Sequence, residues 1–228
     1  MKNKAWLILL AGLAVVLLAG STGVTSSSFT DTEQSIDNTV RCWVFPDYYL
    51  HNNPTPPTGD TNAQAVLPMD TTAPTATTLY NYDMDRDSFA GLWISKGGSG
   101  PGETDPTKHQ VWRSGNLTKS LPIMGTVTID LWSAIKDFGQ GKEGEVIIYL
   151  RDYNGSTYTE IGNGTLYEAD WQGGSSTWVM KTITITGLNY TIPAGNELEV
   201  ELIVGNDSGD NMWFAYDTTS YPSVVKNP

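Results

Sequence analysis

Three aspartates in close succession are the residues of this sequence with the clearest potential for chemistry. Asp83, Asp85 and Asp87 are separated from one another by single residues. Carboxylates at this spacing in a loop can converge on one hard cation, as the first ligands of a calcium loop do. The complete EF-hand pattern is not present, because Ser88 and Ile94 stand where that loop requires Gly and Glu.

A calcium ion bound there would need further ligands from elsewhere in the chain. In a β-sandwich, a distant loop carbonyl or the carboxylate of Asp217 could supply them. The alternative is a solvated acidic turn, or an edge strand whose outward carboxylates deter pairing with other strands. Calcium is therefore the only cofactor that the sequence indicates, and the solvated turn is the competing interpretation.

Aromatic side chains form a second group of candidate binding residues. The chain contains 8 tryptophans and 11 tyrosines. Trp171 and Trp178 flank a Gly-Gly-Ser-Ser loop, and we expect them to be exposed, where their rings could stack on the apolar faces of sugars. The alternative is that most of these rings are core residues or cross-strand pairs.

Motifs for catalysis find little support in the sequence. His51 and His109 lie far apart and outside ligand-spaced motifs such as H-E-x-x-H. The chain contains no Gly-x-Ser-x-Gly elbow, and Cys42 lacks the electropositive neighbours that activate a thiol. Nothing in the order of the residues singles out two carboxylates for glycoside hydrolysis. We therefore expect a protein that is not an enzyme.

The first residues of the chain predict export from the cytoplasm. Lys2 and Lys4 precede an apolar, uncharged run from Ala5 to Ala19, which small polar residues follow. This order is typical of a secretory signal peptide. The run is shorter than the about 20 residues that a membrane span needs, and an uncleaved anchor is the alternative. We expect a signal peptide over residues 1–24, no membrane span in the mature chain, and a secreted or cell-surface location.

The charge of the chain restricts its partners. Its formal net charge is −12 at pH 7, from 13 basic and 25 acidic residues. Such a surface repels phosphate backbones and anionic lipids, so we expect no nucleic acid partner. The remaining candidates are other surface proteins, further copies of the same chain, or extracellular glycans.

Alternating apolar and polar residues predict an all-β fold. The period of two is clear over residues 126–131, 143–150, 181–186 and 197–204. One solvent-exposed face and one buried face are typical of antiparallel sheets. Asn154-Gly155 is a strong hairpin signal. We expect an antiparallel, jelly-roll-like β-sandwich over residues 77–228. Because prolines remove backbone donors, we expect residues 25–76 to hold an export signature and an extended, proline-rich N-terminal arm.

The segment directly after the leader resembles a known export signature. Residues 27–39 read S-S-F-T-D-T-E-Q-S-I-D-N-T. This is similar to the F-x-D-T-E-x-S-x-x-N-T start of proteins cleaved by a SipW-type signal peptidase, which include the TasA/camelysin fibre subunits. The resemblance implies cleavage near Gly23 to Ser28. In the fibre subunits it further implies a jelly roll whose N-terminal segment adds as a strand to the next subunit.

The rest of the chain resembles a β-sandwich module of large secreted bacterial proteins. Residues 132–138, 192–195 and 212–219 carry this second resemblance. It implies a fold and a location, and no activity.

Potential glycosylation sites are spread over the predicted domain. Asn-x-Ser/Thr sequons suit the exposed loops of an exported protein. The five sequons begin at Asn116, Asn154, Asn163, Asn189 and Asn206.

Two functional hypotheses follow from the sequence. The first is a secreted or cell-surface structural or adhesive module that self-assembles by strand addition, with residues 41–45 completing the sheet edge of a neighbour. The second is a carbohydrate-binding module that is stabilised by calcium.

Overall fold

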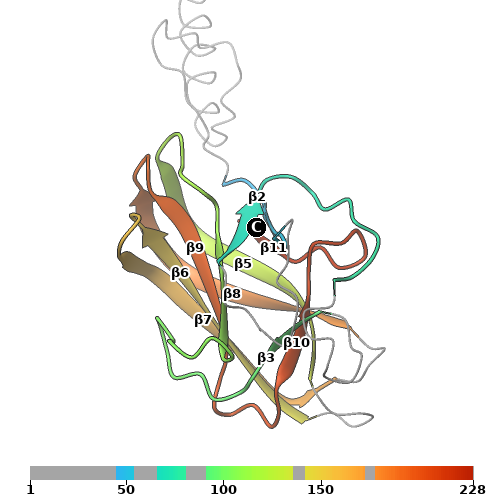
Figure 1. Cartoon of the computed structure of the whole chain (residues 1–228). Coiled ribbons are helices and arrows are strands. Elements are labelled where there is room, and N and C mark those ends of the chain that lie inside the picture. Colours follow the sequence, from blue (N-terminus) through green and yellow to red (C-terminus); the bar gives the residue numbers. More distant parts are fainter. Residues whose placement is uncertain (1–44, 54–65, 81–90, 136–141, 173–177, 228) are drawn as a thin grey trace, which may run out of the picture. The chain divides into compact units, whose positions relative to one another are not determined.

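The computed structural model describes residues 45–53, 66–80, 91–135, 142–172 and 178–227. They all belong to one compact unit, Trp43–Pro228. The described residues form strands and loops, and no helix occurs among them (Figure 1). The strands are β1 (Tyr48–Leu50), β2 (Leu67–Asp70), β3 (Leu92–Ile94), β4 (His109–Arg113), β5 (Leu121–Ile135), β6 (Lys142–Tyr153), β7 (Tyr158–Trp171), β8 (Val179–Ile192), β9 (Glu197–Val204), β10 (Met212–Ala215) and β11 (Val224–Lys226).

All eleven strands belong to one hydrogen-bonded sheet. Its order is β3-β10-β5-β11-β1-β2-β4-β9-β6-β7, and β8 pairs with β5 beside this path. The expected all-β class is confirmed, but the sheet is mixed rather than purely antiparallel. β2 and β4 run parallel, with Leu67 opposite Trp112. The connection from Asp70 to His109 is long enough for the crossover that a parallel pair requires.

The long strands lie where the alternating sequence predicts them. β5 and β8 pair from Leu121↔Ile192 to Ser133↔Val179. β6 lies between β7 and β9 and pairs with both. The predicted Asn-Gly hairpin is confirmed: Tyr153 pairs with Tyr158, and the Asn154 amide donates to the Thr157 carbonyl at 3.1 Å. β-branched residues at alternate positions therefore place these strands as the sequence indicates.

The sheet folds back so that its inward faces share one hydrophobic core. Val127 and Ile129 of β5 belong to the same buried cluster as Val146 and Ile148 of β6. β7 approaches β8 so closely that Gly164 leaves no space for a side chain. A Cβ added there would lie 2.8 Å from the Thr184 carbonyl oxygen. The two long strand groups thus pack against each other over residues far apart in the sequence.

The segment expected to form an arm contributes two strands to the middle of the strand order. β1 pairs with β11 and β2, and β2 continues the sheet to β4. Leu50 and Met69 are buried in the core. The expectation of an extended arm is therefore wrong for residues 48–50 and 67–70. Pro68 has no backbone N–H to donate to a neighbouring strand. Its side chain is exposed, and its carbonyl oxygen accepts a hydrogen bond from the His51 amide at 2.9 Å.

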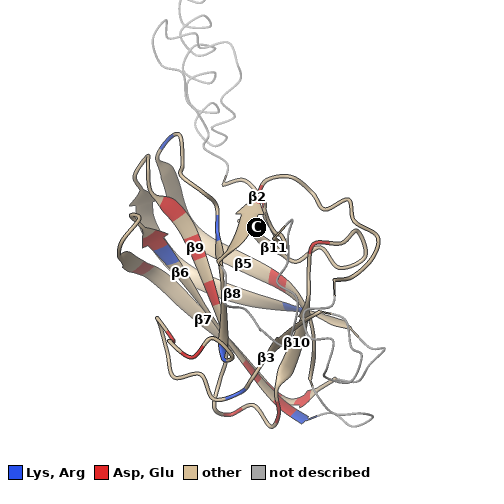
Figure 2. Cartoon of the chain, in the orientation of Figure 1, with Lys and Arg blue, Asp and Glu red and all other residues tan. Residues whose placement is uncertain are grey.

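The outward face of β9 holds buried charges. Glu199 and Glu201 face away from the apolar core, as the alternation predicts, yet both are buried. The Arg151 guanidinium of β6 forms an ion pair with each of these carboxylates, at 2.7 Å from Glu201. The charged residues of β9 and β6 lie side by side in Figure 2. Buried carboxylates of this kind require paired cations, because an unpaired buried charge is costly.

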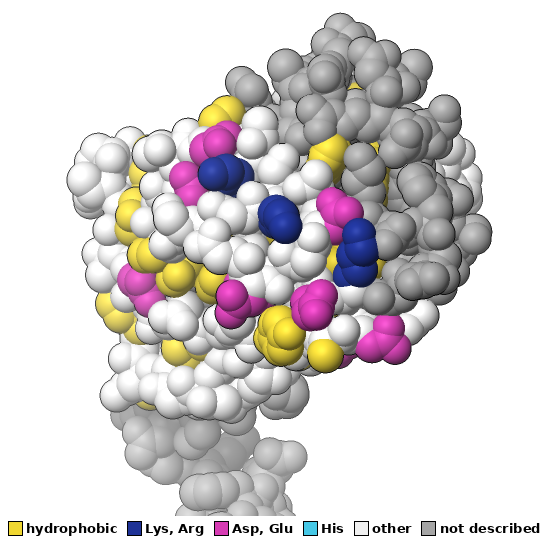
Figure 3. Space-filling model, turned by 90° about the horizontal axis from the view of Figure 1, so that it is seen from below, with side chains coloured by type: hydrophobic (Ala, Val, Ile, Leu, Met, Phe, Trp, Pro, Cys, Tyr) yellow, Lys and Arg dark blue, Asp and Glu magenta, His cyan; other side chains and the backbone are white. Residues whose placement is uncertain are grey.

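The surface carries charges of both signs. Seen from below, basic and acidic side chains are interspersed on this face of the molecule (Figure 3). In the part of the chain that the structure describes, there is no helix with the length and hydrophobicity needed to cross a membrane.

Candidate functional site

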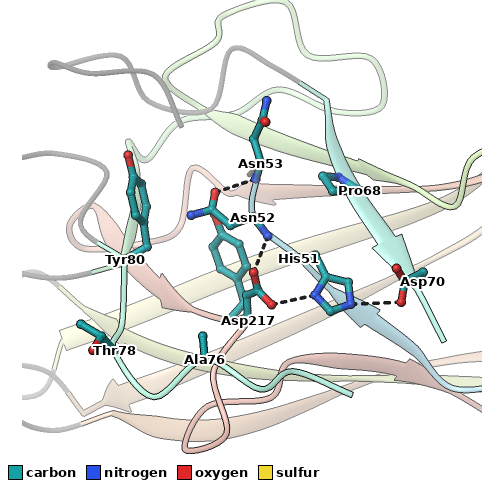
Figure 4. Close-up of a pocket in the computed structure, with 10 residues that line it drawn as sticks. His51, Asn52, Asn53, Pro68, Asp70, Ala76, Thr78, Tyr80 and Asp217 are labelled. Atoms are coloured by element: carbon teal, nitrogen blue, oxygen red, sulfur yellow. Dashed lines mark hydrogen bonds and ion pairs between the residues drawn. The ribbon is translucent and has the colours of Figure 1, made fainter. Parts of the chain in front are cut away.

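A histidine between two carboxylates is the most distinctive polar arrangement on the described surface. His51 follows directly after β1. Its Nδ1 lies 2.7 Å from Asp217 Oδ1. Its Nε2 lies 3.1 Å from the Thr72 carbonyl oxygen and 3.3 Å from Asp70 Oδ1. Figure 4 shows the imidazole between the two carboxylates.

Three parts of the sheet bring these residues together. β1 and β2 form an antiparallel pair in which Tyr49 lies opposite Asp70 and Leu50 opposite Met69. Asp70, the last residue of β2, is therefore the diagonal cross-strand neighbour of His51. Asp217 comes two residues after the end of β10. Its second carboxylate oxygen accepts a hydrogen bond from the Asn52 amide at 2.9 Å. The site therefore joins the first strand pair to the C-terminal part of the sheet.

The backbone at Asp217 is unusual. Its φ is +58°, the only positive φ at a non-glycine residue in the described ranges. Aspartate tolerates this left-handed conformation better than most residues do, because its short side chain can form local hydrogen bonds. Such backbone strain is often found at ligand-binding and active sites. Here it directs the carboxylate toward His51 and the Asn52 amide.

Both carboxylates favour the charged form of the histidine. The hydrogen bond with Asp217 raises the pKa of His51, burial opposes this, and the nearby charges of Asp217 and Asp70 add to the increase. Burial disfavours the charged form of Asp70, yet hydrogen bonds from Thr72 and the proximity of His51 hold its pKa below the usual value. Both carboxylates therefore favour an imidazolium over a neutral imidazole at this position.

The site opens into a cavity of about 530 Å³. This volume lies within the range of ligand pockets, about 300–1,000 Å³. In Figure 4, Tyr80 stands on the opposite side of the cavity from His51. The residues that line it are His51, Asn52, Asn53, Pro68, Asp70, Ala76, Thr78, Tyr80, Tyr216 and Asp217.

The hydrogen-bond geometry restricts what the histidine can do. A histidine acting as a general base needs one ring nitrogen free to accept a proton from a nucleophile. In His51 both ring nitrogens face acceptors: Nδ1 faces Asp217, and Nε2 faces Asp70 and the Thr72 carbonyl. The arrangement suits a fixed positive charge that orders two carboxylates around a cavity.

The residues proposed as calcium ligands are only partly within the described residues. Asp83, Asp85 and Asp87 lie outside them. Asp217 lies within them, and its oxygens accept hydrogen bonds from His51 and Asn52. Across the described ranges, no group of three or more His, Cys, Asp or Glu side chains could hold a metal ion. Within the described residues, the carboxylate of Asp217 is therefore paired with the His51 side chain and the Asn52 amide.

The tryptophans expected on the surface are placed differently. Trp171 is fully buried, and its indole Nε1 donates to Ser133 Oγ at 3.2 Å. Trp178 is partly buried and packs against the cluster of Trp93 and Trp213. The expectation that Trp171 forms an exposed platform is wrong, because Gly144 leaves room for its ring inside the fold.

All five predicted sequons begin at an exposed residue. Asn116, Asn154 and Asn206 lie between strands, whereas Asn163 and Asn189 lie on β7 and β8. Exposure is the property that modification would require.

The sequence contained no strong signal for the histidine site. His51 and Asp217 are 166 positions apart. Each residue type is common by itself, and no short motif links them. The two side chains meet in the assembled sheet, where β1 pairs with β11 and Asp217 lies in the segment between β10 and β11.

Comparisons with known proteins find similarity in fold alone. No protein family profile matches the sequence, and no characterised protein matches it either. Among solved structures, an aminopeptidase from a marine sediment archaeon, Thaumarchaeota archaeon, aligns with a TM-score of 0.55 at 10% identity, over 79% of this chain and 36% of its own. A CocE/NonD family hydrolase from Staphylococcus aureus aligns with a TM-score of 0.53 at 9% identity, over 79% and 36%.

These likenesses correct the functional expectation from the sequence. A structural or adhesive module, a carbohydrate-binding module, and a protein that is not an enzyme were the sequence-based hypotheses, and the structural neighbours are hydrolases instead. At this identity the likeness shows the shared fold alone. The chain spans 36% of the length of each of these hydrolases.

Proposed function

We propose that this chain functions in the hydrolysis of ester or amide bonds, as the β-sheet domain of a hydrolase. The observation that carries the proposal is the coverage of the alignments. They extend over 79% of this chain but 36% of the aminopeptidase and of the CocE/NonD hydrolase. A fold that is shared over most of this chain and a minority of those enzymes corresponds to one part of them.

The geometry of the histidine site supports a binding role within such an enzyme. The Nε2 atom of His51 faces a carboxylate and a backbone carbonyl, where a catalytic base would face a hydroxyl or thiol. In this proposal the nucleophile comes from another domain or chain. The cavity beside His51 and Asp217 receives part of the substrate, because it combines a suitable volume with fixed polar groups.

Two experiments on the full chain test this proposal together. One titrates it with carboxylic esters, aminoacyl anilides and short peptides by isothermal calorimetry, and the other follows product release from the same compounds. We expect saturable binding without turnover. Absence of binding and of turnover for every compound would overturn the proposal. Turnover that is lost in His51→Ala would overturn the assignment of the nucleophile to another domain.

We further propose that the sheet is a jelly-roll-like β-sandwich and that the chain is exported. A jelly-roll-like sandwich is supported by the long antiparallel pairs β5–β8 and β6–β9, whose inward residues share one core. Secretion, with SipW-type cleavage and a TasA/camelysin-like mature start, rests on residues 1–39, which lie outside the described residues. N-terminal sequencing of the protein recovered from the medium tests it, and an intact Met1 would contradict it.

A further inference from the structure

The charges around the His51 cavity do not cancel. One histidine, with at most a single positive charge, lies between the carboxylates of Asp70 and Asp217, at 3.3 and 2.7 Å. The two carboxylates carry one more unit of charge than the histidine. Loss of the histidine proton would make the group more negative still. A ligand that enters this cavity therefore meets an excess of negative charge at any pH near neutrality.

The two carboxylates differ in their availability to a ligand. The side chain of Asp70 is 58% exposed and that of Asp217 is 27% exposed. Asp70 lies farther from the imidazole, and its Oδ1 is held by the Thr72 amide at 2.6 Å, so it presents an ordered and exposed carboxylate to a ligand. Asp217 is held by His51 and by the Asn52 amide, so it supplies a fixed negative charge.

We propose that this cavity binds a primary ammonium group. An ammonium presents three donors on a compact charge, and it needs acceptors without demanding strict coordination geometry. Asp70 and Asp217 supply charged acceptors. The ring of Tyr80, in the opposite wall of the cavity, can face the cation or its carbon stem.

This inference rests on the proposed function and names the substrate class of the same site. The ammonium would be the amino end of a peptide or amino acid derivative whose ester or amide bond is hydrolysed. His51 acts as a positioning residue: it holds Asp217 in place, and it keeps the negative charge low enough for the empty cavity to be stable.

The test compares a ligand that has a free ammonium group with its acetylated derivative, which has no charge at that nitrogen. The full chain is titrated with L-alaninamide and with N-acetyl-L-alaninamide at pH 6.5 by calorimetry and by NMR. We expect the charged amide to bind about tenfold more tightly, since one close charge pair typically contributes at this level. Asp70→Asn and Asp217→Asn should each reduce that preference. Asp207→Asn, a change of an exposed loop carboxylate, is the matched control and should leave it unchanged.

Each other outcome has a defined meaning. Equal affinity for the two amides would overturn ammonium recognition and leave the proposed hydrolase role standing. Failure of both amides and of the wider set of esters and anilides to bind would overturn both proposals. Displacement of alaninamide by millimolar CaCl₂ in the wild type, lost in Asp217→Asn, would identify a metal site and overturn the ammonium assignment. Circular dichroism of each variant separates lost binding from lost folding.

Discussion

The imidazole of His51 and the carboxylate of Asp217 are 166 positions apart in the sequence and 2.7 Å apart in the fold. This contact ties the segment after β1 to the segment after β10. It also places both side chains in the lining of the cavity that we propose as a binding site. One contact therefore contributes both to the stability of the fold and to the chemistry of its surface.

The first prediction concerns the dependence of stability on pH. The folded-state pKa of His51 is raised above 6.5, so its contribution is fully present below pH 6.5 and is lost as the pH rises through the folded pKa. In His51→Asn the melting temperature should fall at pH 6, and the difference from wild type should shrink toward pH 9. Thermal unfolding monitored by circular dichroism across this range measures it. A difference that is constant with pH would contradict the assignment.

Asp70 should show the opposite dependence at acid pH. Its pKa is held below 3.8, so the stability that it contributes is present above pH 3.8 and lost as the pH falls through the folded pKa. The melting temperatures of wild type and Asp70→Asn should therefore converge at low pH. Because Asp70 is 58% exposed, solvent screens its charge and the effect should be small. Curves that diverge on acidification would rule out this role.

The buried charge network of β6 and β9 should be sensitive to loss of its central cation. Arg151→Met leaves Glu199 and Glu201 buried without that partner. We expect a loss of about 3–5 kcal/mol in the free energy of unfolding, the usual cost of breaking a buried pair by removing one partner. Urea denaturation measures it. Lys119→Met, at an exposed position, is the matched control and should change little.

The ring of Trp171 should leave no room for a side chain at position 144. An added Cβ would lie 2.5 Å from Trp171 Cε3. Gly144→Ala should therefore cost about 1–3 kcal/mol, as overpacking of a core does. Gly209→Ala is the comparison and should cost less, because its Cβ would lie 3.0 Å from the end of the flexible Glu143 side chain and 3.3 Å from the Glu143 carbonyl oxygen. In a Trp171→Phe background, Gly144→Ala should lower the free energy of unfolding by less than it does in the wild type. If the losses of the two single variants simply add in the double variant, direct contact between the two residues is contradicted.

Calcium remains a prediction from the aspartates at 83, 85 and 87. If a loop formed by Asp83, Asp85 and Asp87 binds the ion in the native state, calcium must raise the melting temperature and a chelator must lower it. Differential scanning calorimetry with calcium and with EDTA measures this, and the triple change to Asn should abolish it. The same melting temperature in both buffers would exclude a structural calcium ion.

The sequence determined the local structure of several long strands and of one hairpin turn. Alternating apolar residues predict β5, β6, β8 and β9, because a strand with one buried face requires that period. The Asn154-Gly155 turn is a property of two adjacent residues, and it is found as predicted. These features depend on neighbours in the chain, so they can be read without knowing the fold.

The tertiary structure decided which residues meet. The parallel pairing of β2 with β4 and the burial of Glu201 against Arg151 both depend on the order of strands in the sheet. Trp171 is buried because Gly144 lies beside it, and His51 is functional in our proposal because Asp217 lies beside it. Contacts between distant segments cost loop entropy and are stabilised only by the assembled core, so no local pattern in the sequence records them.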